Sequence, residues 1–345
     1  MKGLVKFQEG PGNVEIRDIE MPSPKAGEVL IEVKNAGLCG SDLHILHADI
    51  AIPMKPPFVM GHEFSGVVAG VGEGVTAFKL GDRVVSETAF SFCGKCHLCV
   101  SGFYNLCNMR RSLGYWYNGA FTNYTVTPQD RLHLLPESID FVTAAMIEPM
   151  ACVSHAIYDL SVINAADVVL VTGPGAIGLM AALIAKAEGA IVVMSGTDAD
   201  VKRLEEARSL GIDHTINIQN EDLEKLVMEL TNGDGAAVVI ECAGNAAAAN
   251  QGMALCKKRG YFVQIGLNNK PVTFNLDTIC FRELKFSGSL GSTKAAWRRS
   301  IALLASKKVN IRPLATHVMP VTDWKKAFEM FERKEGGKLI FTPAE

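Results

Sequence analysis

Residues Val168 to Ala182, VVLVTGPGAIGLMAA, decide the fold of the second half of the chain. A β-branched run typical of a buried strand leads into an Ala-, Leu- and Ile-rich run typical of a buried helix. Between them, glycines form a G-x-G-x-x-G pattern, which in this context lets backbone N–H groups and the helix N-terminus approach a pyrophosphate. The stretch predicts a dinucleotide site that includes Gly173, Gly175, Ala176, Ile177 and Gly178.

The alternation of strand and helix continues from about Ser154 to Ser289. Strand-like runs rich in Val and Ile alternate with helical patterns. This succession predicts an α/β fold, with a doubly wound parallel sheet of the Rossmann type covered by helices on both faces. The strand-like runs are DVVLVTG, AIVVMSG, HTINI, AAVVIECAG and YFVQIG, and the helical ones are IGLMAALIAKAEG, ADVKRLEEARSLG and NEDLEKLVMELTNG.

A carboxylate that binds the cofactor ribose is expected about 20 residues after the last glycine of the pattern, where Asp198 lies. The strand AIVVMSG ends in Ser-Gly, however, and these small residues leave room for a 2′-phosphate beside Thr197. Lys202 or Arg203 would then supply the positive charge that pairs with this phosphate. Asp198 and Asp200 are also suited to cap the following helix. Both NAD and NADP stay open, and NAD is slightly favoured.

The first 150 residues or so have a different character. Short β-rich runs alternate with turns of Gly, Pro and Asp, and this half holds almost every Cys and His that could act chemically. Near the end of the chain, two helical patterns flank the strand-like ATHVMP, and a short KLIFTP strand follows. We expect this last segment to return to the first domain, since 345 residues suffice for about two domains.

Charge and hydropathy exclude several partners. The 34 Lys and Arg against 37 Asp and Glu give a net charge of −3, without the positive excess of a nucleic-acid binder. The uncharged run from Val168 to Ala185 is long enough for a membrane span, but its Gly-Pro-Gly turn favours a strand and a helix, so no membrane partner is expected. Because the N-terminus also lacks the apolar core of a secretory signal, we expect a cytoplasmic protein.

Four of the nine cysteines are spaced C-x2-C-x2-C-x7-C in one loop. In a reducing compartment, clustered thiols bind metal more often than they form disulfides. Four thiolates close a tetrahedral zinc shell and leave no position for a substrate, so the predicted site is structural. Its ligands are Cys93, Cys96, Cys99 and Cys107.

The motifs GLCGSDLH, GHEFSGVV, GDRVV, CGKCHLC, IEPMACVSHA and GPGAIG occur in this order. With them, the whole chain resembles the zinc-dependent medium-chain dehydrogenase family, and within it the sorbitol (L-iditol) and polyol dehydrogenases, which are related to galactitol-phosphate and threonine dehydrogenases. The resemblance implies a GroES-like, β-rich catalytic domain of residues 1–153 and 290–345 and a Rossmann domain of residues 154–289. It also implies that nicotinamide and zinc meet between the two domains.

The resemblance assigns roles to residues whose spacing alone could not show that they meet. Ser41 and His44 match the hydroxyl and the imidazole that carry away the substrate proton. Glu63 matches a carboxylate that can exchange with water, and Glu148 stands in place of a cysteine, so manganese or cobalt could replace zinc. Asp42 is a candidate partner for a ligand. The implied ligands of the catalytic zinc are Cys39, His62, Glu63 and Glu148.

The implied reaction is hydride transfer between NAD(P) and a secondary alcohol or polyol, such as a sugar alcohol or its phosphate, with zinc lowering the pKa of the substrate hydroxyl. The alternatives are a threonine dehydrogenase-type activity and a binding protein that kept the fold without catalysis. The resemblance also implies a homodimer or homotetramer. The aromatic run Tyr115 to Tyr117 is suited either to substrate contacts or to packing.

Overall fold

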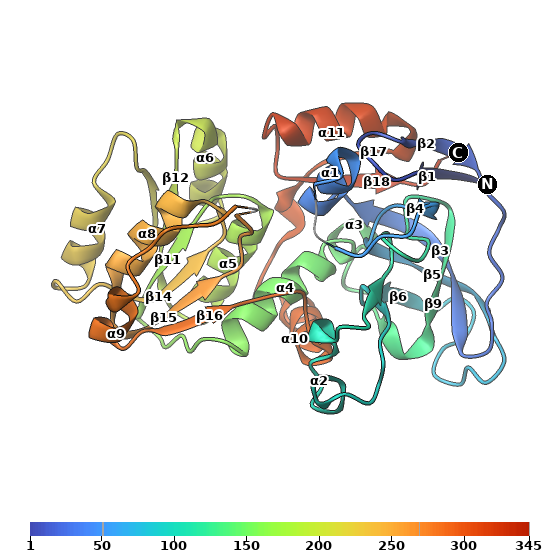
Figure 1. Ribbon diagram of the computed structural model, residues 1–345, viewed down its shortest axis with the longest axis horizontal. Helices are drawn as coiled ribbons and strands as arrows, with labels where there is room; N and C mark the ends of the chain where they lie inside the picture. The colour runs from blue at the N-terminus through green and yellow to red at the C-terminus, as the bar shows by residue number, and fades with distance from the viewer. Residues whose placement is uncertain (50–51, 269, 345) are drawn as a thin grey trace. The chain divides into compact units, whose positions relative to one another are not determined.

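The computed structural model describes residues 1–49, 52–268 and 270–344, and they form two compact units (Figure 1). The first unit comprises Met1–Pro149, Ser292–Ser306 and Ile311–Glu345. The second unit comprises Met150–Gly291 and Lys307–Asn310. The end of the chain thus belongs mainly with its beginning.

The first unit is rich in β-structure. Its strands are β1 (Lys2–Lys6), β2 (Val14–Asp18), β3 (Glu28–Gly37), β4 (Phe58–Val59), β5 (Glu63–Val71), β6 (Arg83–Ser86), β7 (Ala89–Ser91), β8 (Arg111–Ser112), β9 (Tyr124–Pro128), β10 (Leu132–Leu134), β17 (Ala315–Pro320) and β18 (Lys338–Thr342). The main sheet has the order β10-β6-β5-β3-β18-β17, with β9 also paired to β3. A smaller sheet has the order β2-β1-β4, and β7 pairs with β8.

Short helices complete the first unit. They are α1 (Gly40–His47), α2 (His97–Val100), α3 (Phe141–Ala144), α10 (Lys294–Ala305) and α11 (Trp324–Glu332), with 3-10 turns η1 (Tyr104–Leu106), η2 (Gln129–Arg131), η4 (Arg312–Leu314) and η5 (Val321–Asp323). Apolar side chains from both sheets and from α11 share one core, which includes Phe58, Phe64 and Phe328. Burial of this apolar surface holds the strand ends in place around the candidate metal ligands.

The second unit is a six-stranded parallel sheet with flanking helices (Figure 1). Its strands are β11 (Val168–Thr172), β12 (Ile191–Gly196), β13 (His214–Asn217), β14 (Ala236–Glu241), β15 (Cys256–Gln264) and β16 (Lys285–Gly288). Its helices are α5 (Ala176–Ala187), α6 (Val201–Ser209), α7 (Leu223–Leu230), α8 (Ala246–Leu255) and α9 (Asp277–Arg282), with the turn η3 (Asp198–Asp200); α4 (Ile147–Tyr158) begins in the first unit and continues into the second.

The strand order β13-β12-β11-β14-β15-β16 is that of a Rossmann sheet, which confirms the predicted fold class. All its strand pairs are parallel. The order reverses between β11 and β14, which is where such sheets bind ligands at the carboxyl ends of their strands. In the part of the chain that the structure describes, no helix combines the length and the apolar character needed to cross a membrane.

Candidate catalytic metal centre and nucleotide site

The register of two strands brings the candidate metal ligands together. β3 ends at Gly37 and pairs antiparallel with β5, which begins at Glu63, so Gly37 lies opposite Glu63. Cys39 follows β3 and is the N-cap of α1, while His62 immediately precedes β5. Segments that are far apart in the sequence therefore meet at one end of the sheet.

Cys39, His62 and Glu63 offer one thiol, one imidazole and one carboxylate, and their ligand atoms all lie within 4.8 Å of one another. The His62 side chain is 4% exposed, and Glu63 is fully buried. Zinc binds donor sets of this kind in proteins. Glu148, in the first turn of α4, is buried as well, but it is not one of the three residues of this group.

Two neighbours orient these side chains. Asp42 accepts a hydrogen bond of 2.9 Å from the backbone N–H of Cys39, and its other carboxylate oxygen lies 3.9 Å from Nδ1 of His62. Thr88 donates a hydrogen bond of 2.7 Å to Oε1 of Glu148. Such outer partners fix the direction of metal ligands. The sequence suggested Asp42 for this role, but it gave no sign of Thr88.

The charges of this site are unbalanced. Burial raises the pKa of Asp42 to about 6 and also raises the pKa of Glu148. Burial alone would lower the pKa of His62, but the hydrogen bond to Cys39 and the charges of Cys39 and Asp42 raise it to about 10. Within the described residues, Asp42 Oδ1, His62 Nδ1 and Glu63 Oε1 have no hydrogen-bond partner. A divalent cation would correct both features, so the residues fit a zinc ion.

Lys338 is a residue of the site that sequence reasoning missed. It opens β18, is 3% exposed, and places Nζ 2.5 Å from Oε2 of Glu63. Gly37 makes room for this ion pair, because a Cβ atom there would lie 3.1 Å from Cε of Lys338 and would collide with Oε2 of Glu63. The pair places an ammonium group beside a carboxylate that is fully removed from water. The only feature of the sequence that pointed to Lys338 was its position as the first residue of an otherwise apolar strand.

Ser41 and His44 lie three residues apart on α1, and therefore on the same side of the helix. Nδ1 of His44 is 2.8 Å from Oδ1 of Asp49. The hydroxyl of Tyr115 donates a hydrogen bond of 2.7 Å to Oγ of Ser41, and the Tyr115 ring lies 5.2 Å from the His62 ring. Burial, together with the negative charge of neighbouring groups, raises the pKa of Tyr115 well above its ordinary value. This phenol therefore keeps its proton.

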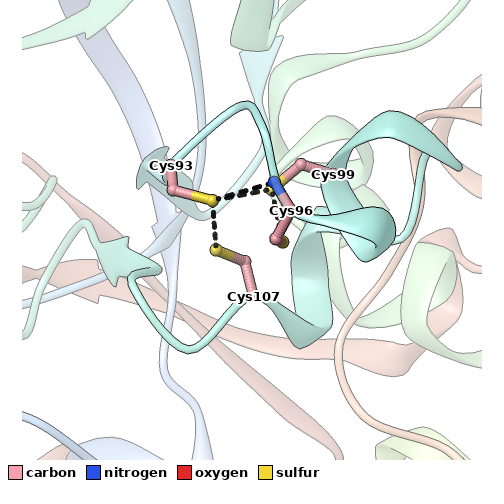
Figure 2. Close-up of side chains that lie close together, drawn as sticks. All are labelled: Cys93, Cys96, Cys99 and Cys107. Atoms are coloured by element: carbon pink, nitrogen blue, oxygen red, sulfur yellow. Dashed lines mark hydrogen bonds between the residues drawn. The ribbon is translucent and has the colours of Figure 1, made fainter.

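The four cysteines of the loop converge on one point (Figure 2). Their sulfur atoms all lie within 4.8 Å of one another. The pairs Cys96–Cys99, Cys93–Cys107 and Cys93–Cys99 have sulfur atoms 3.5, 3.6 and 3.8 Å apart. Tetrahedral zinc with Zn–S bonds of about 2.3 Å separates its sulfurs by about 3.8 Å, whereas a disulfide requires about 2.05 Å. The loop thus fits a closed four-thiolate zinc shell.

The backbone of the loop favours a thiolate at Cys93, whereas burial raises the pKa of Cys99 to about 12. A tyrosine of the loop connects it to the rest of the unit. N–H groups of Lys95 and Cys96 lower the pKa of Cys93 to about 6. The hydroxyl of Tyr104 donates a hydrogen bond of 2.5 Å to the buried carboxylate of Glu87, which Arg131 and His133 also contact.

The glycine pattern lies between β11 and α5. Gly173 has a φ of +86°, and a Cβ atom there would lie 2.8 Å from Cα of Ala243. Gly175 is the N-cap of α5, which Ala176 and Ile177 open. A Cβ atom at Gly178 would collide with the carbonyl oxygen of Gly173. The close turn therefore requires glycine. It places the N-terminus of α5 where the strand order reverses, which is where Rossmann sheets bind a pyrophosphate.

The candidate ribose ligands follow β12. Asp198 is exposed and accepts hydrogen bonds from Asn217 and Asn220 at 2.7 and 3.0 Å. Thr197 donates a hydrogen bond of 2.8 Å to Asp200, so it is Asp200 that closes the turn η3. Arg203 lies half-buried on α6. The segment thus offers both a carboxylate and a guanidinium near the place of the ribose.

The second unit has a Rossmann sheet, and the β-rich unit holds a converging group of Cys, His and carboxylate as well as a four-cysteine loop. Together these features define a nucleotide-dependent metalloenzyme. The profile of the alcohol dehydrogenase GroES-like domain matches residues 25–137, and that of the zinc-binding dehydrogenase matches residues 176–306. The chain belongs to the zinc-binding dehydrogenase family, as its motifs predicted, and it is an oxidoreductase.

Each of the following relatives covers 95% or more of the chain. A sorbitol dehydrogenase of Halalkalibacterium halodurans is 44% identical over 344 residues, covering 99% of each chain. A D-arabitol-phosphate dehydrogenase of Enterococcus avium is 40% identical over 95% of this chain and 94% of its own. An L-threonine 3-dehydrogenase of Bacillus subtilis is 35% identical over 99% of each. A Sinorhizobium meliloti structure described as a zinc-binding dehydrogenase bound to NADP is 29% identical, covers 99% of each chain and superposes with a TM-score of 0.89.

Proposed function

We propose that this protein is a zinc-dependent dehydrogenase that transfers hydride between NAD(P) and a polyol or another secondary alcohol. The observation that carries the proposal is the converging group of Cys39, His62 and Glu63, in a chain 44% identical over its length to a sorbitol dehydrogenase. The similarity to an arabitol-phosphate dehydrogenase extends the substrate class to phosphorylated polyols. In this proposal, residues 1–153 and 290–345 form the catalytic domain, and residues 154–289 form the domain that binds NAD(P).

In this proposal, separate side chains hold the metal ion and accept the substrate proton. Zinc, when bound, supplies a positive charge that lowers the pKa of a substrate hydroxyl and polarises a carbonyl. Cys39, His62 and Glu63 would hold the ion together with Glu148, and Glu63, which is paired with Lys338, would be the exchangeable carboxylate. Oγ of Ser41 would accept the proton of the substrate hydroxyl while the serine's own hydrogen passes on towards His44, so that the serine stays neutral.

The proton must then leave the buried site. His44 lies on the same side of α1 as Ser41, and its side chain is 36% exposed, so it can release the proton to water. Its contact with Asp49 fixes the direction of the ring. In the other unit, the start of α5 would bind the cofactor pyrophosphate, and Asp198 or Arg203 would contact its ribose or 2′-phosphate.

A substrate panel tests this proposal. Purified protein with measured zinc content is assayed with sorbitol, arabitol phosphate, galactitol phosphate and threonine, each with NAD and with NADP, by the absorbance of the reduced nicotinamide. We expect reduction with a polyol or its phosphate, faster with NAD than with NADP. Zinc-loaded protein that reduces neither cofactor with any polyol would contradict the proposal.

Threonine oxidation is the second candidate. It is favoured by the 35% identity with an L-threonine 3-dehydrogenase over 99% of both chains, and the candidate ligand set permits it. The same panel separates the two activities. A kcat/KM for threonine above that for every polyol would replace the polyol assignment.

We further propose that the protein works in the cytoplasm as a homodimer or homotetramer. The side chains of Phe281 on α9 and Phe286 on β16 are 81% and 41% exposed near an edge of the parallel sheet. Exposed aromatic side chains of this kind often lie in interfaces. Sedimentation equilibrium measures the subunit number, and a monomer at micromolar concentration would contradict this assembly.

A further inference from the structure

We propose that Tyr115 is a positioning residue, whose hydroxyl fixes the orientation of the Ser41 hydroxyl and thereby the direction of proton transfer. This inference rests on the proposed function, because Ser41 is assigned there as the acceptor of the substrate proton. The resemblance that identifies Ser41 gives no role to Tyr115, and sequence alone left it between substrate contact and packing.

Tyr115 contacts two parts of the site at once. Its hydroxyl donates to Oγ of Ser41 at 2.7 Å, and the tilted rings of Tyr115 and His62 have centroids 5.2 Å apart. The side chain is only 5% exposed, so water does not compete freely for its hydroxyl. Among the residues that the structure describes, the Ser41 side chain has no second hydrogen-bond partner. Tyr115 is therefore the group that sets the Ser41 hydroxyl.

The backbone holds Tyr115 in this place. The turn that carries it lies directly on Gly61, the residue before His62. A Cβ atom at Gly119 would collide with the carbonyl oxygen of Gly61, and one at Gly114 would lie 2.9 Å from it. The N–H of Ala120 donates to that same oxygen at 2.9 Å. Because two backbone segments touch without side chains between them, the phenol cannot easily withdraw from Ser41.

The hydrogen-bonding capacity of serine explains the effect. A serine hydroxyl has one hydrogen to donate and two lone pairs that accept. The Tyr115 hydroxyl, which donates to Oγ of Ser41 at 2.7 Å, occupies one of these lone pairs. The other lone pair then faces the substrate hydroxyl, while the hydrogen of Ser41 points away. Without the phenol oxygen, Oγ of Ser41 could rotate among three staggered positions and lose this direction.

A mutant cycle on the zinc-loaded full chain tests the inference, with sorbitol and NAD as the probe. We expect Tyr115→Phe to lower kcat about tenfold, as for loss of one oriented hydrogen bond, and to change KM less than about twofold. In a Ser41→Ala background, the same substitution should lower kcat less than about twofold further. Zinc content should stay unchanged in every variant.

Tyr117→Phe is the matched control. It removes a phenol from the same turn, but this hydroxyl faces Ser91 at 3.3 Å, and its ring stacks on Phe90 at 3.9 Å. We expect its kcat to equal that of the wild type. A tenfold loss from Tyr115→Phe in both backgrounds would show an independent packing role and overturn the inference. A raised KM with unchanged kcat would overturn it too.

Crystal structures of wild type and Tyr115→Phe give a readout that does not depend on turnover. We expect Oγ of Ser41 to occupy one rotamer in the wild type and several in the variant. One shared rotamer in both would overturn the inference. If the wild type does not oxidise sorbitol, that part of the proposed function fails, and the rotamers alone decide the role of Tyr115.

Discussion

The two candidate zinc sites of the first unit are built in opposite ways. The four thiols of the loop come from one short segment, and the loop supports them itself, as when the N–H of Cys96 donates to Sγ of Cys93 at 3.4 Å. The other site draws on distant segments, and its side chains are oriented by Asp42, Thr88 and Lys338. A local, symmetric shell saturates its metal and stabilises a loop, whereas a shell of unlike, separately held ligands can exchange one and accept a substrate.

Replacing His62 with alanine tests the chemical half of this comparison and should have the largest effect. We expect kcat to fall by about 10³-fold or more, because a metal centre contributes several kcal/mol to the transition state. Zinc content should fall from about two ions per chain to about one. Fluorescence titration should show NAD(P)H binding mostly intact, since the glycine turn lies in the other unit. Full activity in this variant would disprove a metal-centred mechanism.

Replacing Cys99 with alanine tests the structural half. An incomplete thiolate shell should lower the melting temperature by about 5–10 °C, which corresponds to a few kcal/mol in a domain of this size. Activity below the new melting temperature should change little. Cys280→Ala, at an exposed cysteine outside both sites, is the control and should melt like the wild type. Unchanged melting of Cys99→Ala with lost hydride transfer would show that the roles of the two sites are reversed.

The same contrast explains what the sequence could predict. The four-cysteine loop and the turn from Gly173 to Gly178 are readable because ligands and backbone demands lie within one short segment. Cys39 lies near His62 because of the register between β3 and β5. The spacing of the two residues in the sequence does not reveal this register, so their proximity could be predicted only from the resemblance to a family. Lys338 lies in no recognisable motif. It reaches the site only because β18 pairs with β3.

Secondary structure shows a similar limit. The sequence predicted the first five strands of the parallel sheet, whose runs of β-branched residues are distinctive. It did not predict α8, whose AAAANQGMAL has a weak amphipathic pattern, or the edge strand β16, whose KFSG is short and largely exposed. An exposed short strand, and an alanine-rich helix with little contrast between its faces, leave little pattern in the sequence.

Lys338→Met tests how the charge of Glu63 is balanced at the catalytic metal site. Without the ammonium, Glu63 would be a buried charge without its partner, which destabilises a protein by about 3 kcal/mol or more. We expect metal-free protein to melt about 6 °C lower, and zinc-loaded protein to lose less than half of that, because bound zinc replaces the missing positive charge. Lys6→Met is the matched control. Lys6 is also buried, but its Nζ contacts the carbonyl oxygens of Gly10 and Gly12, so its loss should lower both melting temperatures equally. If Lys338→Met lowered the melting temperatures of the metal-free and the zinc-loaded protein equally, Lys338 would have no role in the charge balance of the metal site.

Thr88→Val makes the smallest change, since it keeps the shape of the side chain and removes only the hydrogen bond to Glu148. If Glu148 needs this partner to point at the metal, competition with a chelator should show zinc bound about tenfold more weakly at the catalytic site. The four-cysteine loop should hold its zinc unchanged, because, among the residues that the structure describes, no side-chain hydroxyl contacts its sulfur atoms. Thr127→Val, which removes a hydroxyl 3.0 Å from Ser86 in the same unit, should leave both affinities as they are. Equal affinities in Thr88→Val and the wild type would mean that the distant site needs less outside support than its geometry indicates.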